Sequence, residues 1–188
     1  NVPLFSGLDE SELQRLSQVA VRRRAGRNEQ VVRAGEDAES LIVLLTGRAK
    51  VTNFDEEGRE IILAWLGPGE FFGEMGLIDG SPRSASVVAV EPCELLTIGK
   101  TEFQRCMQEN FQVAQKLMQI LVRRLREADR NIESLALLDV YGRVARLLLD
   151  LSEEEGGKRL VRQKISKQDM ARMIGASREM VSKVMRDL

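Results

Sequence analysis

The chain has 188 residues, of which 43% are apolar, so it can hold one large or two small domains around a sizeable core. It has two cysteines and no histidine, which excludes histidine-based catalysis, zinc sites that need histidine and histidine-ligated haem. The formal net charge is −1, but residues 158–188 are strongly basic and the rest is acidic, which favours a polyanionic partner at that end over an ordinary solvated surface.

The first hundred residues predict a short helix followed by strands. Asp9-Glu10-Ser11-Glu12 is typical of a capping box and predicts a helix over 9–18. Runs rich in Val, Ile and Leu then alternate with glycine-containing turns, which is typical of an all-β barrel or sandwich. The predicted strands cover residues 31–32, 41–45, 49–54, 61–66, 86–90 and 95–98.

The stretch Gly69–Val88, GEFFGEMGLIDGSPRSASVV, has the chemistry of a phosphate site. A glycine at 73 lets the backbone approach a ligand, and a helix starting near Glu74 would offer N–H groups to an anion. Arg83 can pair with a phosphate and Ser84 can donate its hydroxyl. Glu74 repels phosphate, so it fits only as an acceptor from a sugar hydroxyl. The alternative is that Glu74 and Arg83 form an internal ion pair on a turn.

Two helices are predicted next, over 102–109 with Thr101 as its cap, and over 111–137. The longer one carries a heptad seam with charged flanks, at Ala114, Met118, Leu121, Leu125, Ala128, Ile132 and Leu135. A stripe this narrow predicts a homodimer through helix 111–137, because a helix packed on its own domain usually has a wider apolar face. Packing on its own domain remains the alternative.

The C-terminal part predicts a helix-turn-helix. A helix is expected over 139–151, an acidic loop over 152–157 and a short strand within 158–165. Ser166 would cap a helix over 167–173, Gly175 would turn the chain, and Ser177 would cap a helix over 178–188. These helices expose the residues that we expect to contact DNA, namely Lys167, Gln168, Ser177, Arg178, Glu179 and Lys183. Arg178 suits guanine O6 and N7, and Glu179 suits cytosine N4, unless Glu179 only neutralises Arg178.

Three motifs together resemble the catabolite activator protein (CRP/FNR) family of bacterial regulators. GEMGL at 73–77 with SPRSA at 81–85 is similar to its phosphate-binding cassette. LALLDV with Gly142-Arg143, and GASRE at 175–179, resemble its hinge and recognition helix. The resemblance implies an α+β fold with a jelly-roll-like β-roll at 1–110, a dimerisation helix at 111–137 and a winged helix-turn-helix at 138–188, whose wing would follow Leu188.

The resemblance also implies an effector, partners and a site. The effector would be cyclic AMP or cyclic GMP, the partners double-stranded DNA and RNA polymerase, and the location the cytoplasm. The ligand-binding residues would be Gly73, Glu74, Met75, Arg83, Ser84 and Asp129. Members that bind cyclic AMP have a Thr-Ser pair where this chain has Ala128 and Asp129, so its base preference is expected to differ. The family commonly has arginine at the position of Lys183, which puts one guanine contact in doubt.

Two other functions are compatible with these motifs. A regulator of the same fold could respond to cyclic di-GMP or to no nucleotide, and a cyclic-nucleotide module could control an enzyme or a channel. We expect no enzyme, because the sequence has no nucleophile–base pair, metal cluster or Walker loop. Iron–sulfur clusters need about four cysteines. No membrane span or signal peptide is visible, and the chain begins at Asn1 and ends within a helical pattern, as a piece of a longer protein would.

Overall fold

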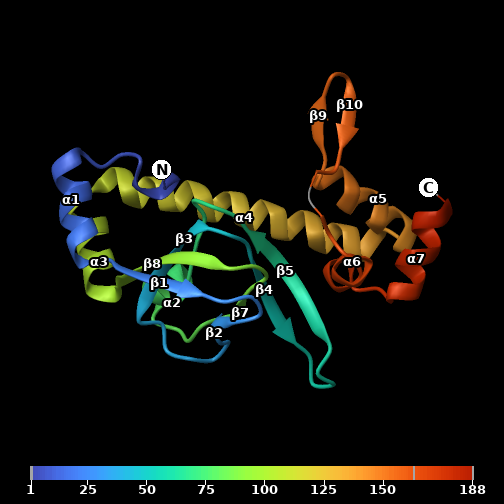
Figure 1. The fold of residues 1–188 in the computed structure, drawn as a ribbon, viewed down its shortest axis with the longest axis horizontal. Coiled ribbons are helices and arrows are strands. Elements are labelled where there is room, and N and C mark those ends of the chain that lie inside the picture. The colour runs from blue at the N-terminus through green and yellow to red at the C-terminus, as the bar shows by residue number, and fades with distance from the viewer. Residues whose placement is uncertain (1, 163, 188) are drawn as a thin grey trace. The chain divides into compact units, whose positions relative to one another are not determined.

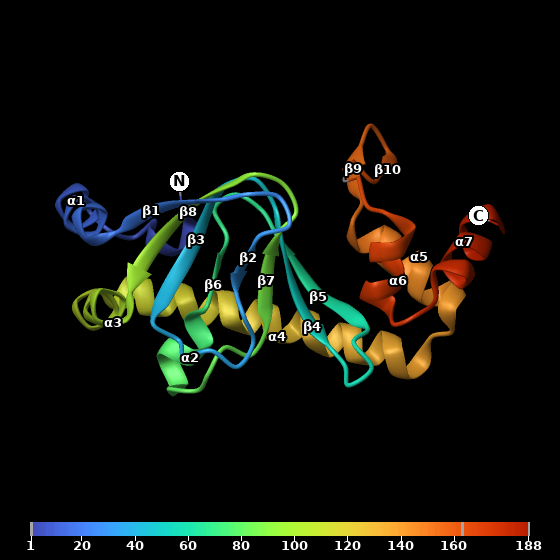
Figure 2. The ribbon, with the colours of Figure 1, turned by 60° about the horizontal axis from the view of Figure 1, so that its bottom comes forward.

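The computed structural model describes residues 2–162 and 164–187 (Figure 1). Backbone contacts divide the chain into two compact units. The first unit comprises residues 1–54 and 63–121, and the second comprises residues 55–62 and 122–188. The fold is therefore mixed, with β-sheets in the first part of the chain, a long helix after them and a helical C-terminal part (Figure 2).

Two antiparallel four-stranded sheets form the roll. One has the order β1-β8-β3-β6, with bounds Val21–Ala25, Cys93–Gly99, Ser40–Thr46 and Phe71–Phe72. The other has the order β2-β7-β4-β5, with bounds Gln30–Val32, Ser86–Ala89, Ala49–Phe54 and Glu60–Leu66. Neighbours such as β3 and β8 lie far apart in the sequence, as in a jelly roll. The strands predicted from the sequence are all present, and β1 and β6 are additional.

Strand β3 separates two hydrophobic cores. Leu41 and Val43 pack in one core with Phe103 and Val113, whereas Ile42 and Leu44 pack in the other, between the sheets. Successive side chains of a strand point to opposite faces. A strand covered on both faces must therefore be apolar at every position, which explains the uninterrupted run Leu41–Leu45.

Helices cover the outer face of the β3 sheet. They are the 3-10 turn η1 (Pro3–Phe5), α1 (Glu10–Val19), α3 (Lys100–Glu109) and the first part of α4 (Phe111–Leu137). The capping box is confirmed, since Asp9 Oδ1 accepts from the Glu12 N–H at 2.8 Å and Glu12 Oε2 accepts from the Asp9 N–H at 2.8 Å. The predicted cap at Thr101 is wrong. The Lys100 N–H donates to the Glu39 carbonyl at 2.9 Å, so strand β8 passes into α3 before Thr101 is reached.

The second unit contains α5 (Val140–Asp150), the hairpin β9 (Glu153–Glu155) and β10 (Lys158–Leu160), α6 (Lys167–Ile174) and α7 (Arg178–Asp187). The acidic loop predicted over 152–157 is wrong, because β9 pairs with β10 there. Glu155 lies opposite Lys158 and Glu154 opposite Arg159, and opposite charges across a strand pair stabilise it. Gly156 and Gly157 both have positive φ, at 58° and 75°, as a two-residue hairpin turn requires.

Cys93 and Cys106 are both free thiols. Cys93 is buried between the sheets, and Cys106 packs partly buried against the other core. Burial raises the pKa of both thiols, so both remain protonated near neutral pH and act as small apolar side chains.

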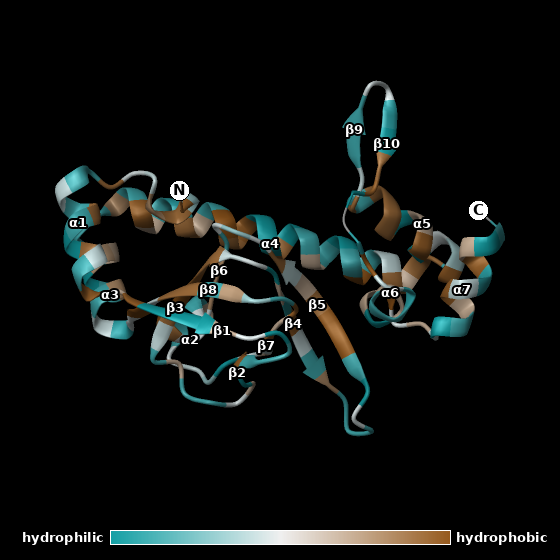
Figure 3. Cartoon of the chain, viewed as in Figure 1, coloured by the Kyte–Doolittle hydropathy of each residue, from teal (hydrophilic) through white to brown (hydrophobic). Residues whose placement is uncertain are grey.

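Among the residues that the structure describes, no helix is both long enough and apolar enough to cross a membrane. The longest helix, α4, mixes polar and apolar residues along its length (Figure 3). Val113 and Leu117 are buried in the core of the first unit, and Ile120 and the predicted seam residue Leu121 pack partly buried against that core. The seam residues Met118, Leu125 and Ile132 are exposed.

Candidate functional site

The cassette starts at a glycine that no other residue can replace without strain. Gly73 precedes helix α2 (Glu74–Asp79) and adopts a left-handed conformation with φ of 86°. A Cβ atom at this position would collide with Nη1 of Arg83 and lie 3.0 Å from the Ser40 carbonyl oxygen. The missing side chain therefore makes room for the arginine, beyond allowing the turn itself.

Arg83 is fixed by the backbone of two distant segments. Its side chain is buried, with 8% of the residue exposed. Nη1 donates to the Gly73 carbonyl at 2.8 Å and Nη2 donates to the Ser40 carbonyl at 2.7 Å. The guanidinium is thereby oriented by the fold, and the cost of ordering this long side chain does not fall on ligand binding.

Carboxylates surround this guanidinium. Glu74 is buried with 3% exposed. Burial lowers the pKa of Arg83 below its ordinary value, and the negative charges of Glu74, Glu36 and Glu39 act in the opposite direction. Arginine stays protonated in proteins. The attraction between Glu74 and Arg83 is thus part of the fold, and the guanidinium also donates to the Gly73 and Ser40 carbonyls and, at 3.5 Å, to the Ser40 hydroxyl.

The predicted cassette residues come together from both ends of the motif. The Ser84 Oγ atom lies 3.7 Å from the Met75 Sδ atom, and both residues are exposed. Gly73 and Glu74 are joined to this group through Arg83. Asp129 lies on the exposed surface of α4 in the second unit, and its role toward a ligand remains a prediction.

The sequence alone missed the loop that precedes β3. The Arg83 N–H donates to the Glu36 carbonyl at 2.8 Å, and the Gly35 N–H donates to the Arg83 carbonyl at 2.8 Å. These two bonds hold the main chain of Arg83, whereas the carbonyl of Ser40, the first residue of β3, holds its side chain. Main-chain contacts of this kind leave no residue-type signal, so no motif could have shown them.

The second candidate surface is the helix-turn-helix of α6 and α7. Ser166 caps α6, its Oγ accepting from the Asp169 N–H at 3.0 Å, and Gly175 turns the chain with φ of 61° and ψ of 46°. Ser177 Oγ accepts from the Met180 N–H at 3.2 Å. Arg143 of α5 donates to the Ile174 carbonyl at 2.7 Å and fastens the turn. The predicted caps and turn are confirmed.

The residues predicted to contact DNA are all exposed. Buried side chains of α5, α6 and α7 form one core, at Val144, Leu147, Met170, Ala171, Ile174, Val181 and Val184. The exposed residues of this part of the chain include Lys167, Gln168, Ser177, Arg178, Glu179 and Lys183. Two further residues, Ser182 and Arg186, share a face of α7 with Arg178 because residues four apart lie one above the other. Lys167 Nζ lies 3.3 Å from Ser182 Oγ. A search at intervals of four residues from Arg178 would have found both.

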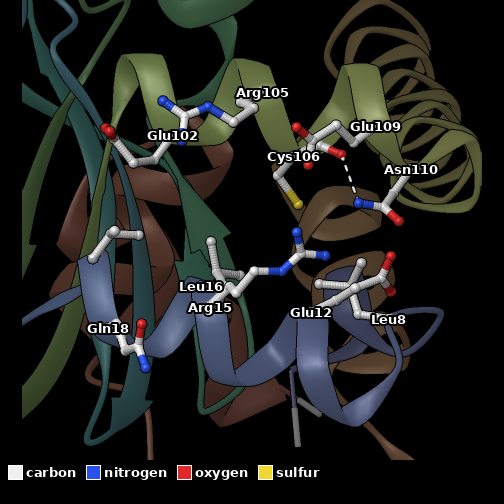
Figure 4. Close-up of a pocket in the computed structure, with 11 residues that line it drawn as sticks. Leu8, Glu12, Arg15, Leu16, Gln18, Glu102, Arg105, Cys106, Glu109 and Asn110 are labelled. Atoms are coloured by element: carbon white, nitrogen blue, oxygen red, sulfur yellow. Dashed lines mark hydrogen bonds between the residues drawn. The ribbon is translucent and has the colours of Figure 1, made fainter.

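A cavity of about 300 Å³ lies elsewhere, between α1 and α3 (Figure 4). Leu8, Leu16 and Cys106 are among its apolar lining, and Arg15, Arg105 and Glu102 are among the charged residues that face it. None of the residues predicted from the cassette or the helix-turn-helix lines it.

Two family models match the chain. The model of the cyclic nucleotide-binding domain matches residues 22–110, which include the cassette. The model of the Crp-like helix-turn-helix domain matches residues 142–188, which include α6 and α7.

Curated relatives and solved structures agree with these matches. The chain is 38% identical over 165 residues to the cAMP-activated global transcriptional regulator CRP of Haemophilus influenzae, covering 84% of this chain and 72% of the relative. It is 37% identical over 174 residues to the cAMP-activated regulator Vfr of Pseudomonas aeruginosa, covering 89% and 81%. The c-di-GMP-responsive regulator CLP of Xanthomonas campestris superimposes with a TM-score of 0.80 at 31% identity, covering 95% of this chain and 91% of that one.

Proposed function

This chain belongs to the CRP family of transcription regulators, and we propose that a cyclic nucleotide held at Arg83 controls its affinity for DNA. The observation that carries the proposal is the buried guanidinium of Arg83, oriented by the carbonyls of Gly73 and Ser40. A charged donor kept ready at a tight turn suits a phosphodiester. The regulatory role agrees with the family and requires no enzymatic activity.

Each of the neighbouring residues binds a different part of the nucleotide. Arg83 and the Ser84 hydroxyl take the phosphate, with Gly73 and Met75 bordering it. Glu74, an acceptor when ionised, takes the ribose hydroxyl. Asp129 takes an amino group of the base, since a carboxylate can accept from adenine or from the N1 and N2 edge of guanine.

A homodimer through α4 completes the proposal. The seam residues Met118, Leu125, Ile132 and Leu135 are between 52% and 64% exposed, although the heptad pattern marks them as interface residues. Two copies can cover these side chains by pairing along α4. The domains then serve as a sensor at 1–110, a dimerisation helix at 111–137 and a DNA-binding head at 138–188.

Ligand binding can act on DNA only through a difference in affinity between two orientations of the heads. A hinge near Leu137–Asp139 lies between α4 and α5, where such a change can occur. Two recognition helices about 34 Å apart would meet successive turns of the major groove. RNA polymerase is the expected further partner. Because bacterial DNA lies in the cytoplasm, we expect a DNA-binding regulator to be located there as well.

A titration of the purified protein with cyclic AMP, cyclic GMP and cyclic di-GMP tests the effector. We expect saturable heat with at least one of the three in a calorimeter. The dinucleotide is included because the c-di-GMP-responsive CLP shares the fold and because Ala128 and Asp129 depart from the Thr-Ser pair. Heat from none of them would reject a nucleotide effector and favour a regulator with an unused cassette.

Arg178→Ala is expected to lower the affinity for the protein's own operator by about 1–3 kcal/mol, or about 5- to 150-fold, because it removes a bidentate guanine contact. The operator is first selected from random DNA, and binding is followed by fluorescence anisotropy. Arg146→Ala is the matched control, since it removes an exposed arginine of α5 that pairs with Asp150. Equal affinity of Arg178→Ala and Arg146→Ala would contradict the recognition role of α7.

A further inference from the structure

The arm of the cassette that carries Arg83 and Ser84 leaves the sheet without backbone pairing to β4. Strand β7 lies between β2 and β4 (Figure 2). Its pairing with β4 runs from Ala89, opposite Ala49, to Ser86, opposite Thr52. Ser84 lies beyond the last of these pairs. Something other than the sheet must therefore hold the Ser84 peptide.

The side chain of Asn53 occupies this place. Asn53 follows Thr52 on β4, and its Nδ2 atom donates to the Ser84 carbonyl at 3.0 Å. A side-chain amide thus continues the strand pairing by one step after the backbone pairing has ended. Asparagine is unfavourable inside a strand on propensity alone, so its position here is explained by the bond rather than by the strand.

Other bonds connect the arm to the loop between β2 and β3. The Arg83 backbone is held by Gly35 and Glu36, as described above. Ser86 Oγ accepts from the Ala34 N–H at 3.0 Å. These bonds hold the two ends of the arm on the β2–β3 loop, and Asn53 holds its middle on β4. Ser84 is therefore fixed between two parts of the roll.

The side chain of Ser84 carries the hydroxyl that the proposed function assigns to the phosphate. That hydroxyl lies 3.7 Å from Met75 Sδ, at the start of α2. Without the Asn53 amide, the peptide of Ser84 can rotate and move the hydroxyl away from this side of the cassette. A hydrogen bond weakens as its distance and angle depart from the preferred values, so a displaced hydroxyl binds an anion less well.

We infer that Asn53 is a positioning residue, which sets nucleotide affinity by holding the Ser84 carbonyl so that the serine hydroxyl and the Arg83 guanidinium present a preformed site to the phosphate. The inference rests on the proposed function. It concerns the phosphate and leaves the base untouched, so Asn53 changes the affinity for cyclic AMP and cyclic GMP by the same factor.

The test compares Asn53→Ala with Asn110→Ala in the full chain. Asn110 is a matched control because its Nδ2 atom also donates to a main-chain carbonyl, that of Cys106, at 3.2 Å. Calorimetry with cyclic AMP and with cyclic GMP is expected to show a Kd about 3- to 10-fold weaker for Asn53→Ala, the value of one hydrogen bond. Asn110→Ala keeps the affinity of the unaltered chain. Asn53→Asp, which faces the Ser84 carbonyl with an acceptor, is expected to lose more than Asn53→Ala.

Hydrogen exchange separates this inference from the nucleotide assignment. In the protein without added nucleotide, peptides covering 81–88 are expected to exchange faster in Asn53→Ala than in Asn110→Ala. Unchanged exchange there overturns the inference, whatever the protein binds. Faster exchange with an unchanged Kd overturns it as well, because loosening the arm would then have no effect on nucleotide affinity. If the unaltered chain binds none of the nucleotides, the proposed function fails, and the exchange result alone judges whether Asn53 positions the arm.

Discussion

Replacing Arg83 by alanine is expected to lower cyclic nucleotide affinity by about 30-fold to several thousand-fold, the equivalent of about 2–5 kcal/mol. The substitution removes the charged donor that we propose to bind the phosphate. It also leaves the carboxylates of Glu74, Glu36 and Glu39 without the positive charge that they surround. Calorimetry with the nucleotide that the unaltered chain binds measures the loss.

Two further variants show what the alanine result means. Arg83→Lys keeps a positive charge but cannot donate in a fork to the Gly73 and Ser40 carbonyls, so we expect it to recover only part of the affinity. Ser84→Ala removes one neutral donor and is expected to lose about 3- to 10-fold. Thermal unfolding of each variant reports whether the roll is intact. A folded Arg83→Ala protein that binds nucleotide as tightly as the unaltered chain would show that the phosphate lies elsewhere.

Replacing Leu125 and Ile132 together by glutamate is expected to convert the proposed dimer into monomers. These side chains are 61% and 64% exposed in the single chain, and each contributes about 1.5–3 kcal/mol when a partner helix buries it. A glutamate at the same position would instead have to be buried as an unpaired charge. Sedimentation equilibrium measures the mass directly.

The same variant is expected to bind the operator about 100- to 10,000-fold more weakly, because the two heads no longer bind as one bivalent unit. The double variant Arg123→Glu with Arg130→Glu is the control for the sedimentation measurement. It makes similar changes on α4, at positions outside the apolar seam, and it is expected to remain dimeric. If the glutamate variant of the seam remains dimeric, the exposed apolar residues of α4 do not form the dimer interface.

Local signals in the sequence located most of the helices. The span 111–137 predicted for α4 is the span observed, because an apolar seam and charged flanks act within the helix itself. The capping box at Asp9, the cap at Ser166 and the turn at Gly175 were predicted for the same reason. Each depends on atoms within a few residues of one another, which a short window of sequence contains.

The wrong predictions arose where the structure of a segment depends on the segment that it joins or pairs with. Helix α3 begins at Lys100 because strand β8 extends to Gly99, not because Thr101 is a good cap. The hairpin β9–β10 forms although Glu153–Glu155 resembles an acidic loop, since Lys158 and Arg159 of the opposite strand lie across from Glu155 and Glu154. Propensity describes one segment alone, whereas pairing depends on its neighbour.

From the sequence by itself one can determine the family resemblance, the order of the elements and the chemical groups of the cassette, Gly73, Glu74, Arg83 and Ser84. Only the tertiary structure decided how those groups are held. It brings the Ser40 carbonyl to Arg83 and the Asn53 amide to Ser84, over 43 and 31 residues of chain. The physical reason is that the chemistry of a site needs particular side chains, which a sequence displays. Its geometry depends on main-chain carbonyls, which every residue carries and which only the fold selects.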